Sequence, residues 1–265
     1  MVRLDKLCLQ KRAAFTLVEL LVVVALITVL IAILLPTLGK VRGHAARIAC
    51  LSNLRQLGIA LLSYANENRG VFPGAASVLQ GQDEDWVHWQ PNRDAKNSTL
   101  WAHLGGNLEV LKCPLGVPER LGGPAPPYPY SYSVNMRFTS LFTRGVIPAW
   151  AHPPCKLGRV VKPSRKILAA EEDATVISDG AWHRDSGPNS KMPYISLRHD
   201  GDGREYSDPN DYTLDPLDSH VVVAYRGRGN VVFADGHGDF IDRRMGLFEP
   251  YLAPEDDTPG PIELP

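Results

Sequence analysis

Residues 20–39 read LLVVVALITVLIAILLPTLG and contain no charged side chain. Twenty residues of α-helix span about 30 Å, which is the thickness of the hydrocarbon core of a bilayer. A buried core helix of this length normally keeps a polar stripe, and this stretch has none. A secretory signal peptide would have a shorter apolar run followed by small residues, whereas PTLGK follows here. The stretch therefore predicts a transmembrane helix over residues 15–38.

A short basic segment precedes this helix. Residues 1–14 read MVRLDKLCLQKRAA, with four basic side chains and one acidic one. Because cationic flanks stay on the cytoplasmic side of a membrane, the rest of the chain is expected to be exported. The predicted location is the cytoplasmic (inner) membrane, crossed once, with the N-terminus cytoplasmic and the larger part periplasmic or extracellular.

Glu19 is the exception near the start of the apolar region. A carboxylate is expensive to bury in lipid, so it marks a functional position. The surrounding residues 11–21 read KRAAFTLVELL. This segment resembles the N-terminus of type IV prepilins and type II secretion pseudopilins. That family has a basic leader, a small residue before the cleaved bond, Phe as the first mature residue and Glu as the fifth.

The resemblance implies that a prepilin peptidase removes the leader between Ala14 and Phe15, and that Phe15 is then N-methylated. The family usually has Gly before the cut, where Ala14 stands here. In the family the glutamate pairs with the N-terminal amine of a neighbouring subunit, which implies an assembly role for Glu19. A buried charge needs such a partner.

The helix is expected to continue beyond the membrane as an amphipathic extension over residues 39–70, with Pro36 kinking or loosening it. Gly70 and Pro73 are expected to end it. Apolar and small residues recur at spacings of three and four, which predicts one face ready to pack against a globular head. That face comprises Ile48, Leu51, Leu54, Gly58, Leu61 and Ala65.

Residues 71–265 are expected to form a β-rich head, because short apolar runs alternate with turn residues. A short helix is predicted at Thr99–Leu104, and a hairpin is expected to join His220–Tyr225 to Asn230–Ala234. The fold class is α+β and pilin-like: a long N-terminal transmembrane helix packed on an antiparallel sheet with long loops. The expected strands are Lys166–Glu171, Ala174–Ser178, Tyr194–Arg198, His220–Tyr225, Asn230–Ala234 and Gly238–Asp242.

Several segments resemble a branch of large prepilin-type proteins from planctomycete- and verrucomicrobia-type genomes. Residues 227–237 resemble its C-terminal H-X9-DG signature, which carries over to Asn230, Asp235, Gly236 and His237. In this signature a histidine stands ten residues before the Asp-Gly pair, but that position holds Tyr225 here. The histidine is therefore assigned to His199, and a segment of about residues 202–224 looks inserted between the two halves of the signature. Four other segments match: CLSNLRQLGIAL from Cys50, LKCP at 111–114, SYSVN at 131–135 and PSRKILAAE at 163–171.

The chain has four cysteines, of which Cys8 lies in the leader. Export permits disulfides, and Cys50 and Cys113 lie in branch-like segments, so a Cys50–Cys113 bridge is favoured, with Cys155 left over. The alternative is three free buried thiols.

Hard oxygen ligands suited to Ca²⁺ occur in the head, although no EF-hand spacing is present. Several major pseudopilins bind Ca²⁺, so the resemblance implies a possible structural calcium site. Its candidate ligands are Glu171, Asp200 and Asp235. A solvated acidic surface is the preferred alternative. The histidines are scattered without a zinc-hydrolase spacing.

The charge balance, with 28 basic and 29 acidic residues, gives no reason to expect nucleic-acid binding. No nucleophile, phosphate-binding or dinucleotide-binding motif occurs, so we expect a structural subunit with no cofactor other than that possible Ca²⁺, not an enzyme.

It would assemble into a type II secretion pseudopilus or a type IV-pilus-like filament. Its partners would be prepilin peptidase, other pilin-like subunits, the secretion or pilus machinery and membrane lipid. The alternative is a membrane-anchored periplasmic binding module or enzyme that uses a pilin-like N-terminal anchor.

Overall fold

The protein is described by a computed structural model. Its internal contacts divide the chain into two compact units, Met1–Arg42 and Gly43–Pro265. The predicted cleavage site, Ala14 and Phe15, and most of the predicted strand Ala174–Ser178 lie outside the described residues. The structure describes residues 17–76, 81–116, 128–139, 155–172, 177, 179–182, 195–200, 214–215, 218–222, 227–247 and 249–255.

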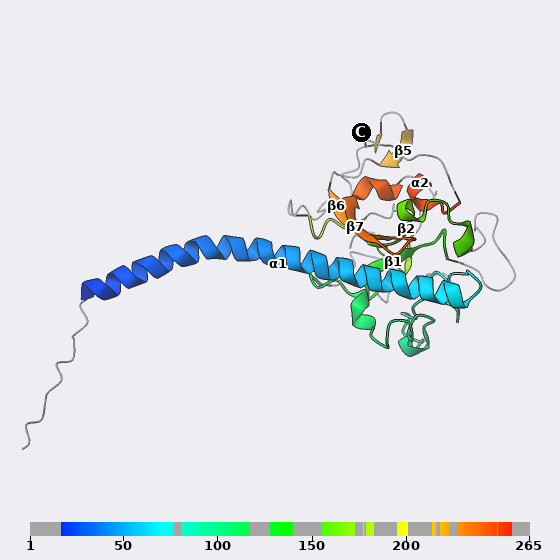
Figure 1. The fold of residues 1–265 in the computed structure, drawn as a ribbon, viewed down its shortest axis with the longest axis horizontal. Helices are drawn as coiled ribbons and strands as arrows, with labels where there is room; N and C mark the ends of the chain where they lie inside the picture. Colours follow the sequence, from blue (N-terminus) through cyan, green and yellow to red (C-terminus); the bar gives the residue numbers. More distant parts are fainter. Residues whose placement is uncertain are drawn as a thin grey trace, which may run out of the picture. The chain divides into compact units, whose positions relative to one another are not determined.

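Helix α1, Leu17–Glu67, is 51 residues long and contributes to both units (Figure 1). The helix continues through Pro36 rather than ending there. It stops where the backbone turns left-handed, with φ of 57° at Arg69 and 83° at Gly70. Glycine accepts this conformation without a steric penalty. The Gly70 N–H donates to the Ala65 carbonyl at 2.7 Å, which satisfies one of the open helix-end acceptors.

Within the second unit, α1 buries one stripe of side chains. The stripe differs from the predicted face at its start, because Ile48 is 64% exposed. Ile48 precedes Leu54 by six residues, which corresponds to an angular separation of about 120° around an α-helix. Its side chain therefore points away from the buried face. The buried residues of α1 are Ala46, Cys50, Leu54, Leu57, Gly58, Ala60, Leu61 and Ala65.

The head contains a five-stranded sheet in the order β3-β1-β2-β6-β7. Neighbouring strands are antiparallel except β1 and β3, which are parallel, so the sheet is mixed rather than wholly antiparallel. A separate two-stranded sheet pairs β4 with β5. The strands are β1 Tyr132–Asn135, β2 Ile167–Glu171, β3 Ala181–Trp182, β4 Leu214–Asp215, β5 Asp218–Val222, β6 Arg228–Phe233 and β7 Gly238–Asp242.

The five-stranded sheet is covered on both faces. One apolar cluster joins α1 to Val134, Leu168 and Val232, while a second joins Ile167 and Phe233 to the C-terminal segment. Burial on both faces explains why β2 and β6 contain continuous apolar runs instead of strict alternation. The remaining helices are short: η1 Ala95–Asn97, η2 Leu108–Leu111, η3 Leu157–Arg159, η4 Pro163–Arg165, η5 Arg243–Leu247 and α2 Glu249–Leu252.

The predicted strands at β2, β6 and β7 are confirmed, but the predicted pairing of His220–Tyr225 with Asn230–Ala234 is wrong. Strand β5 pairs with β4, and β6 instead forms its hairpin with β7. Sequence pattern shows that a run is extended but does not select its partner. Thr99–Leu104 forms turns rather than a helix, and Ile195 makes only an isolated bridge to Glu172. Strands β1, β3 and β4 lie outside the predicted strands.

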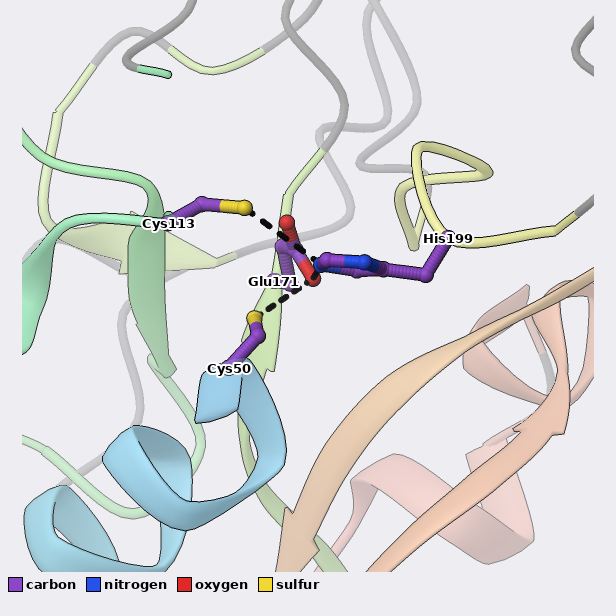
Figure 2. Close-up of side chains that lie close together, drawn as sticks. All are labelled: Cys50, Cys113, Glu171 and His199. Atoms are coloured by element: carbon purple, nitrogen blue, oxygen red, sulfur yellow. Dashed lines mark hydrogen bonds and ion pairs between the residues drawn. The ribbon is translucent and has the colours of Figure 1, made fainter. Parts of the chain in front are cut away.

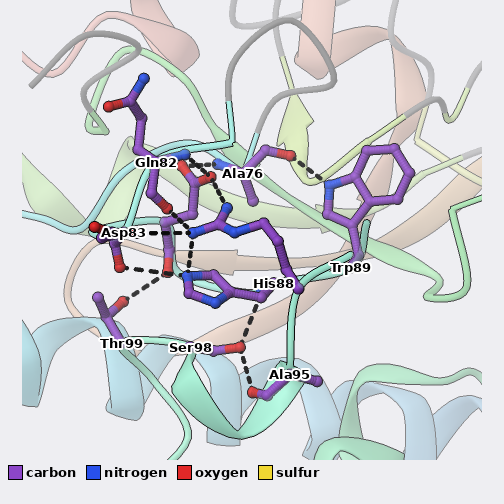
Figure 3. Close-up of polar contacts among 10 residues, drawn as sticks. Ala76, Gln82, Asp83, His88, Trp89, Ala95, Ser98 and Thr99 are labelled. Carbon is purple, nitrogen blue, oxygen red and sulfur yellow. Dashed lines mark hydrogen bonds and ion pairs between the residues drawn. The ribbon is translucent and has the colours of Figure 1, made fainter. Parts of the chain in front are cut away.

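A buried ion pair organises the loop that follows α1. Arg93 Nη1 lies 2.9 Å from Asp85 Oδ2, and Asp85 also accepts the backbone N–H groups of Ala76 and Gln82. The Trp89 indole N–H donates to the Ala76 carbonyl at 2.8 Å (Figure 3). These contacts satisfy buried polar groups and hold the loop against the core.

We expect Leu57→Ala to lower the free energy of unfolding by about 2–5 kcal/mol, because it opens a cavity between α1 and the sheet. Ile59→Ala is the matched control: Ile59 is 59% exposed on the same helix, so a change below about 0.5 kcal/mol is expected. Urea unfolding of the full chain in detergent micelles, followed by tryptophan fluorescence, measures both. Equal losses for the two variants would contradict the assigned packing face.

Candidate functional sites

The first site is the N-terminal part of α1. Its most apolar 18-residue window has a mean hydropathy of 3.2 with none of it buried, so α1 is long and apolar enough to cross a membrane. Glu19 lies in the first turn of this helix and is exposed. The structure thus places the predicted assembly residue on an exposed, apolar part of the helix.

The second site is a buried cluster in the head, which we name the Cys–Glu–His cluster. Its four members point toward one another from well-separated segments: α1, the turn after η2, strand β2 and the segment 195–200 (Figure 2). The potential ligand atoms all lie within 4.8 Å of one another. The members are Cys50, Cys113, Glu171 and His199.

Glu171 is the centre of this cluster. Its Oε2 atom accepts a hydrogen bond from the Cys50 thiol at 2.9 Å and lies 3.2 Å from His199 Nε2. Its Oε1 atom lies 2.9 Å from the Arg198 guanidinium. Cys113 Sγ lies 3.3 Å from the same Nε2 atom of His199. The side chains of Glu171 and His199 are fully buried, so the charges are compensated within the protein rather than by water.

Further hydrogen-bond donors surround the cluster. The Tyr132 hydroxyl donates to Cys50 Sγ at 3.1 Å, and the Asn230 amide donates to Glu171 Oε2 at 3.2 Å. The backbone N–H of Leu115 reaches Cys113 Sγ at 3.4 Å. Each of these groups presents a hydrogen to a sulfur or oxygen, which favours the anionic forms of the cluster side chains.

The pKa values follow from these contacts. Burial raises the pKa of Glu171, but the His199 hydrogen bond and the Arg198 charge outweigh it, so the pKa falls to about 2. Burial lowers the pKa of His199, but hydrogen bonds to Cys113 and Glu171 outweigh it and raise the pKa to about 9. Hydrogen bonding to Cys50 lowers the pKa of Cys113 to about 6 despite burial, whereas burial raises the pKa of Cys50. Glu171 and Cys113 are therefore anionic near neutral pH, whereas the Cys50 thiol keeps its proton.

The predicted partners Cys50 and Cys113 are neighbours, but the predicted bridge is not present. Both are free thiols in the structure, as is Cys155. The short distance between Cys50 and Cys113 agrees with the sequence argument, which favoured this pair because both cysteines lie in branch-like segments. The structure adds Glu171 and His199 as competing partners for the same sulfur atoms.

The structure does not bring the predicted calcium ligands together. Among the described residues, the group within metal-binding reach contains Glu171 but neither aspartate. Asp200 Oδ2 instead accepts the backbone N–H of Arg228 at 2.6 Å. Asp235 Oδ1 lies 2.5 Å from His237 Nδ1 in a partly exposed turn. The two aspartates are used for local turn contacts, whereas Glu171 is buried at the end of β2.

The two halves of the predicted H-X9-DG signature have different roles. Asp235, Gly236 and His237 form the β6–β7 turn, where Gly236 has φ of 89° and its N–H donates to the Phe233 carbonyl. His199 belongs to the buried cluster, which Asn230 also contacts. The histidines are scattered along the sequence without a metal-ligand spacing, so the local pattern does not predict this convergence. The available signal was that the cluster members all occur in segments that carry the branch resemblance.

The cluster does not have the geometry of a cysteine nucleophile with its base. His199 uses one nitrogen, Nε2, toward both Cys113 and Glu171, while its buried Nδ1 has no hydrogen-bond partner among the described residues. An activated nucleophile needs a base that is oriented through its second nitrogen. Two thiols, one imidazole and one carboxylate around one point instead match a set of metal ligands.

Residues 9–35 match the family model of the prokaryotic N-terminal methylation motif. The match includes the Ala14–Phe15 bond, Glu19 and most of the apolar stretch. It supports a prepilin-like protein, and an apolar N-terminal helix with this motif fits a single-pass membrane anchor. Comparison with curated proteins and with solved structures finds no match.

We expect Glu171→Gln to lower the free energy of unfolding by about 3–5 kcal/mol at pH 7 in the presence of a chelator, because it leaves Arg198 buried without its counter-charge. The folded pKa of about 2 lies below the ordinary 4.5, so the carboxylate stabilises the fold above about pH 4.5. The difference from wild type should shrink as the pH falls from there toward 2.

Chemical unfolding of the full chain in micelles across this pH range measures the effect. Glu109→Gln is the control, because the Glu109 side chain is 74% exposed and forms a surface ion pair with Lys112. A wild-type advantage that did not diminish in acid would refute the stabilising role of the Glu171 charge.

Proposed function

We propose that the protein is a pilin-like structural subunit of a type II secretion pseudopilus or a type IV-pilus-like filament. In this proposal prepilin peptidase cleaves between Ala14 and Phe15, and Phe15 becomes the methylated first residue. The observation that carries the proposal is the methylation motif at residues 9–35, whose described part, from Leu17 onward, is a helix with exposed apolar side chains.

The exposed apolar surface supports the assembly step. Large hydrophobic side chains between Leu17 and Val41 are 44–78% exposed, which is costly in water and favourable in lipid. The same surface can exchange lipid for helices of other subunits in a filament core. The work of the protein is then mechanical: storage in the membrane, followed by packing of α1 against its neighbours.

Glu19 would set the register of that packing. Cleavage creates a new N-terminal amine on Phe15, which is positively charged near neutral pH. In an apolar filament core this amine and the Glu19 carboxylate of an adjacent subunit would compensate each other. A subunit shifted along the filament would leave both charges buried without a partner.

The basic leader supports the orientation within the proposal. Residues 1–14 carry the cationic excess and would stay cytoplasmic, so the head would be periplasmic or extracellular. The burial of the Cys–Glu–His cluster supports a structural role over an anchored enzyme, because substrate has no access to fully buried side chains.

Processing is tested by co-expressing the full chain with a prepilin peptidase and measuring the intact mass. We expect loss of residues 1–14 and addition of one methyl group. Ala14→Gly should be cleaved at least as completely, and the chain expressed without peptidase should keep its leader. Retention of the leader by both forms in the presence of active peptidase would overturn the proposal.

Assembly is tested separately with Glu19→Ala. This variant should still be cleaved but should reduce filament incorporation at least tenfold, because the amine of the neighbour loses its counter-charge. Glu109→Ala, an exposed change in the head, is the control and should assemble normally. Quantification of sheared filaments by immunoblotting measures both, and normal assembly of Glu19→Ala would contradict the assigned role.

A further inference from the structure

We propose that Cys50, Cys113, Glu171 and His199 bind a tetrahedral Zn²⁺ ion that fastens helix α1 to the sheet of the head. The proposal concerns the Gly43–Pro265 unit alone and does not depend on processing or assembly of the N-terminal part of α1. The four ligand atoms are the two Sγ atoms, Glu171 Oε2 and His199 Nε2, which Figure 2 shows converging on one point.

The ligand spacing fits this ion. Zinc bonds of about 2.3 Å to sulfur and about 2.0–2.2 Å to nitrogen and oxygen place tetrahedral ligand atoms about 3.3–3.8 Å apart. The corresponding separations here are 3.3 Å from Cys113 to His199, 3.2 Å from His199 to Glu171 and 2.9 Å from Cys50 to Glu171. An outward shift of a few tenths of an ångström would admit the ion.

The ligand chemistry selects zinc over calcium. Two thiolates and an imidazole are soft or intermediate ligands, whereas Ca²⁺ takes six to eight oxygen atoms. Binding would displace the protons of the Cys50 thiol and the His199 imidazolium to solvent. In this proposal Glu171, a predicted calcium ligand, binds a zinc ion instead.

The charges then balance within the buried site. Two thiolates and one carboxylate exceed the charge of Zn²⁺ by one negative unit. Arg198 supplies the compensating positive charge, 2.9 Å from the Glu171 oxygen that faces away from the ion. A buried charge that is both paired and hydrogen-bonded avoids most of its desolvation penalty.

The contacts around the ligands complete the site. Tyr132 donates to Cys50 Sγ, Leu115 N–H to Cys113 Sγ and Asn230 to Glu171 Oε2. Such donors orient metal ligands and stabilise their anionic forms. Because successive ligands along the chain are 28 to 63 residues apart, one ion would close several long loops at once.

The test uses the full chain in detergent micelles, with Cys8→Ser throughout so that the leader contributes no thiol. We expect the reduced protein to hold about one zinc ion per chain by elemental analysis. After chelation, added Co²⁺ should give a thiolate-to-metal charge-transfer band and strong visible bands typical of tetrahedral cobalt. The zinc-loaded form should also melt several degrees above the chelated form.

Variants locate the ion. Cys113→Ser and His199→Ala should each lower bound zinc at least tenfold, whereas Cys155→Ser, the third head cysteine, should keep it. Tyr132→Phe removes only the hydroxyl that donates to Cys50 and should weaken zinc binding by about tenfold. Since ligand variants can unfold, cobalt binding to the chelated wild-type protein provides a measurement that needs no substitution.

Several results would overturn the proposal. One is a Cys50–Cys113 disulfide in the protein as isolated from the exported compartment, with two thiols unreactive until reduction and no metal bound. Others are the absence of zinc and cobalt binding by the reduced protein, weak octahedral cobalt bands without charge transfer, and zinc that survives Cys113→Ser. Loss of zinc in Cys155→Ser with retention in His199→Ala would also assign the ion elsewhere.

Discussion

Burial of the Glu171 carboxylate is the constraint on which the architecture of the head depends. The residue ends β2, the central strand of the five-stranded sheet, and its side chain has no contact with solvent. Both oxygens must therefore be satisfied from within the protein. Arg198 takes one oxygen, while Cys50, His199 and Asn230 share the other. One carboxylate thereby connects α1, β2, β6 and the segment 195–200.

Helix α1 meets two different requirements along its length. Its N-terminal part exposes apolar side chains suited to lipid and to other helices, and its C-terminal part buries a stripe against the sheet. Gly58 allows the close approach at the centre of that stripe, since a Cβ there would lie 2.7 Å from Val232 Cγ2. A longer side chain would force the helix away from the sheet, and Cys50 with it.

The segments that resemble the prepilin branch acquire a common physical explanation in the head. Cys50, Cys113, Tyr132, Glu171 and His199 come from separate segments of that resemblance and meet in or beside one cluster. The Asp-Gly turn of the predicted C-terminal signature has another role. It closes the β6–β7 hairpin, and the Gly238 carbonyl just beyond it accepts a hydrogen bond from the Arg55 side chain of α1.

The local features were predictable from sequence. Hydropathy determined the long helix, the segment around Glu19 indicated the prepilin-like N-terminus, and apolar runs located β2, β6 and β7, because each of these depends on neighbouring residues. Tertiary structure alone decided that β5 pairs with β4, that β3 runs parallel to β1, and that Ile48 leaves the buried face. It also decided that Glu171 joins two cysteines and His199 rather than two aspartates. Strand pairing and ligand convergence depend on contacts between residues distant in sequence, and no local pattern encodes them.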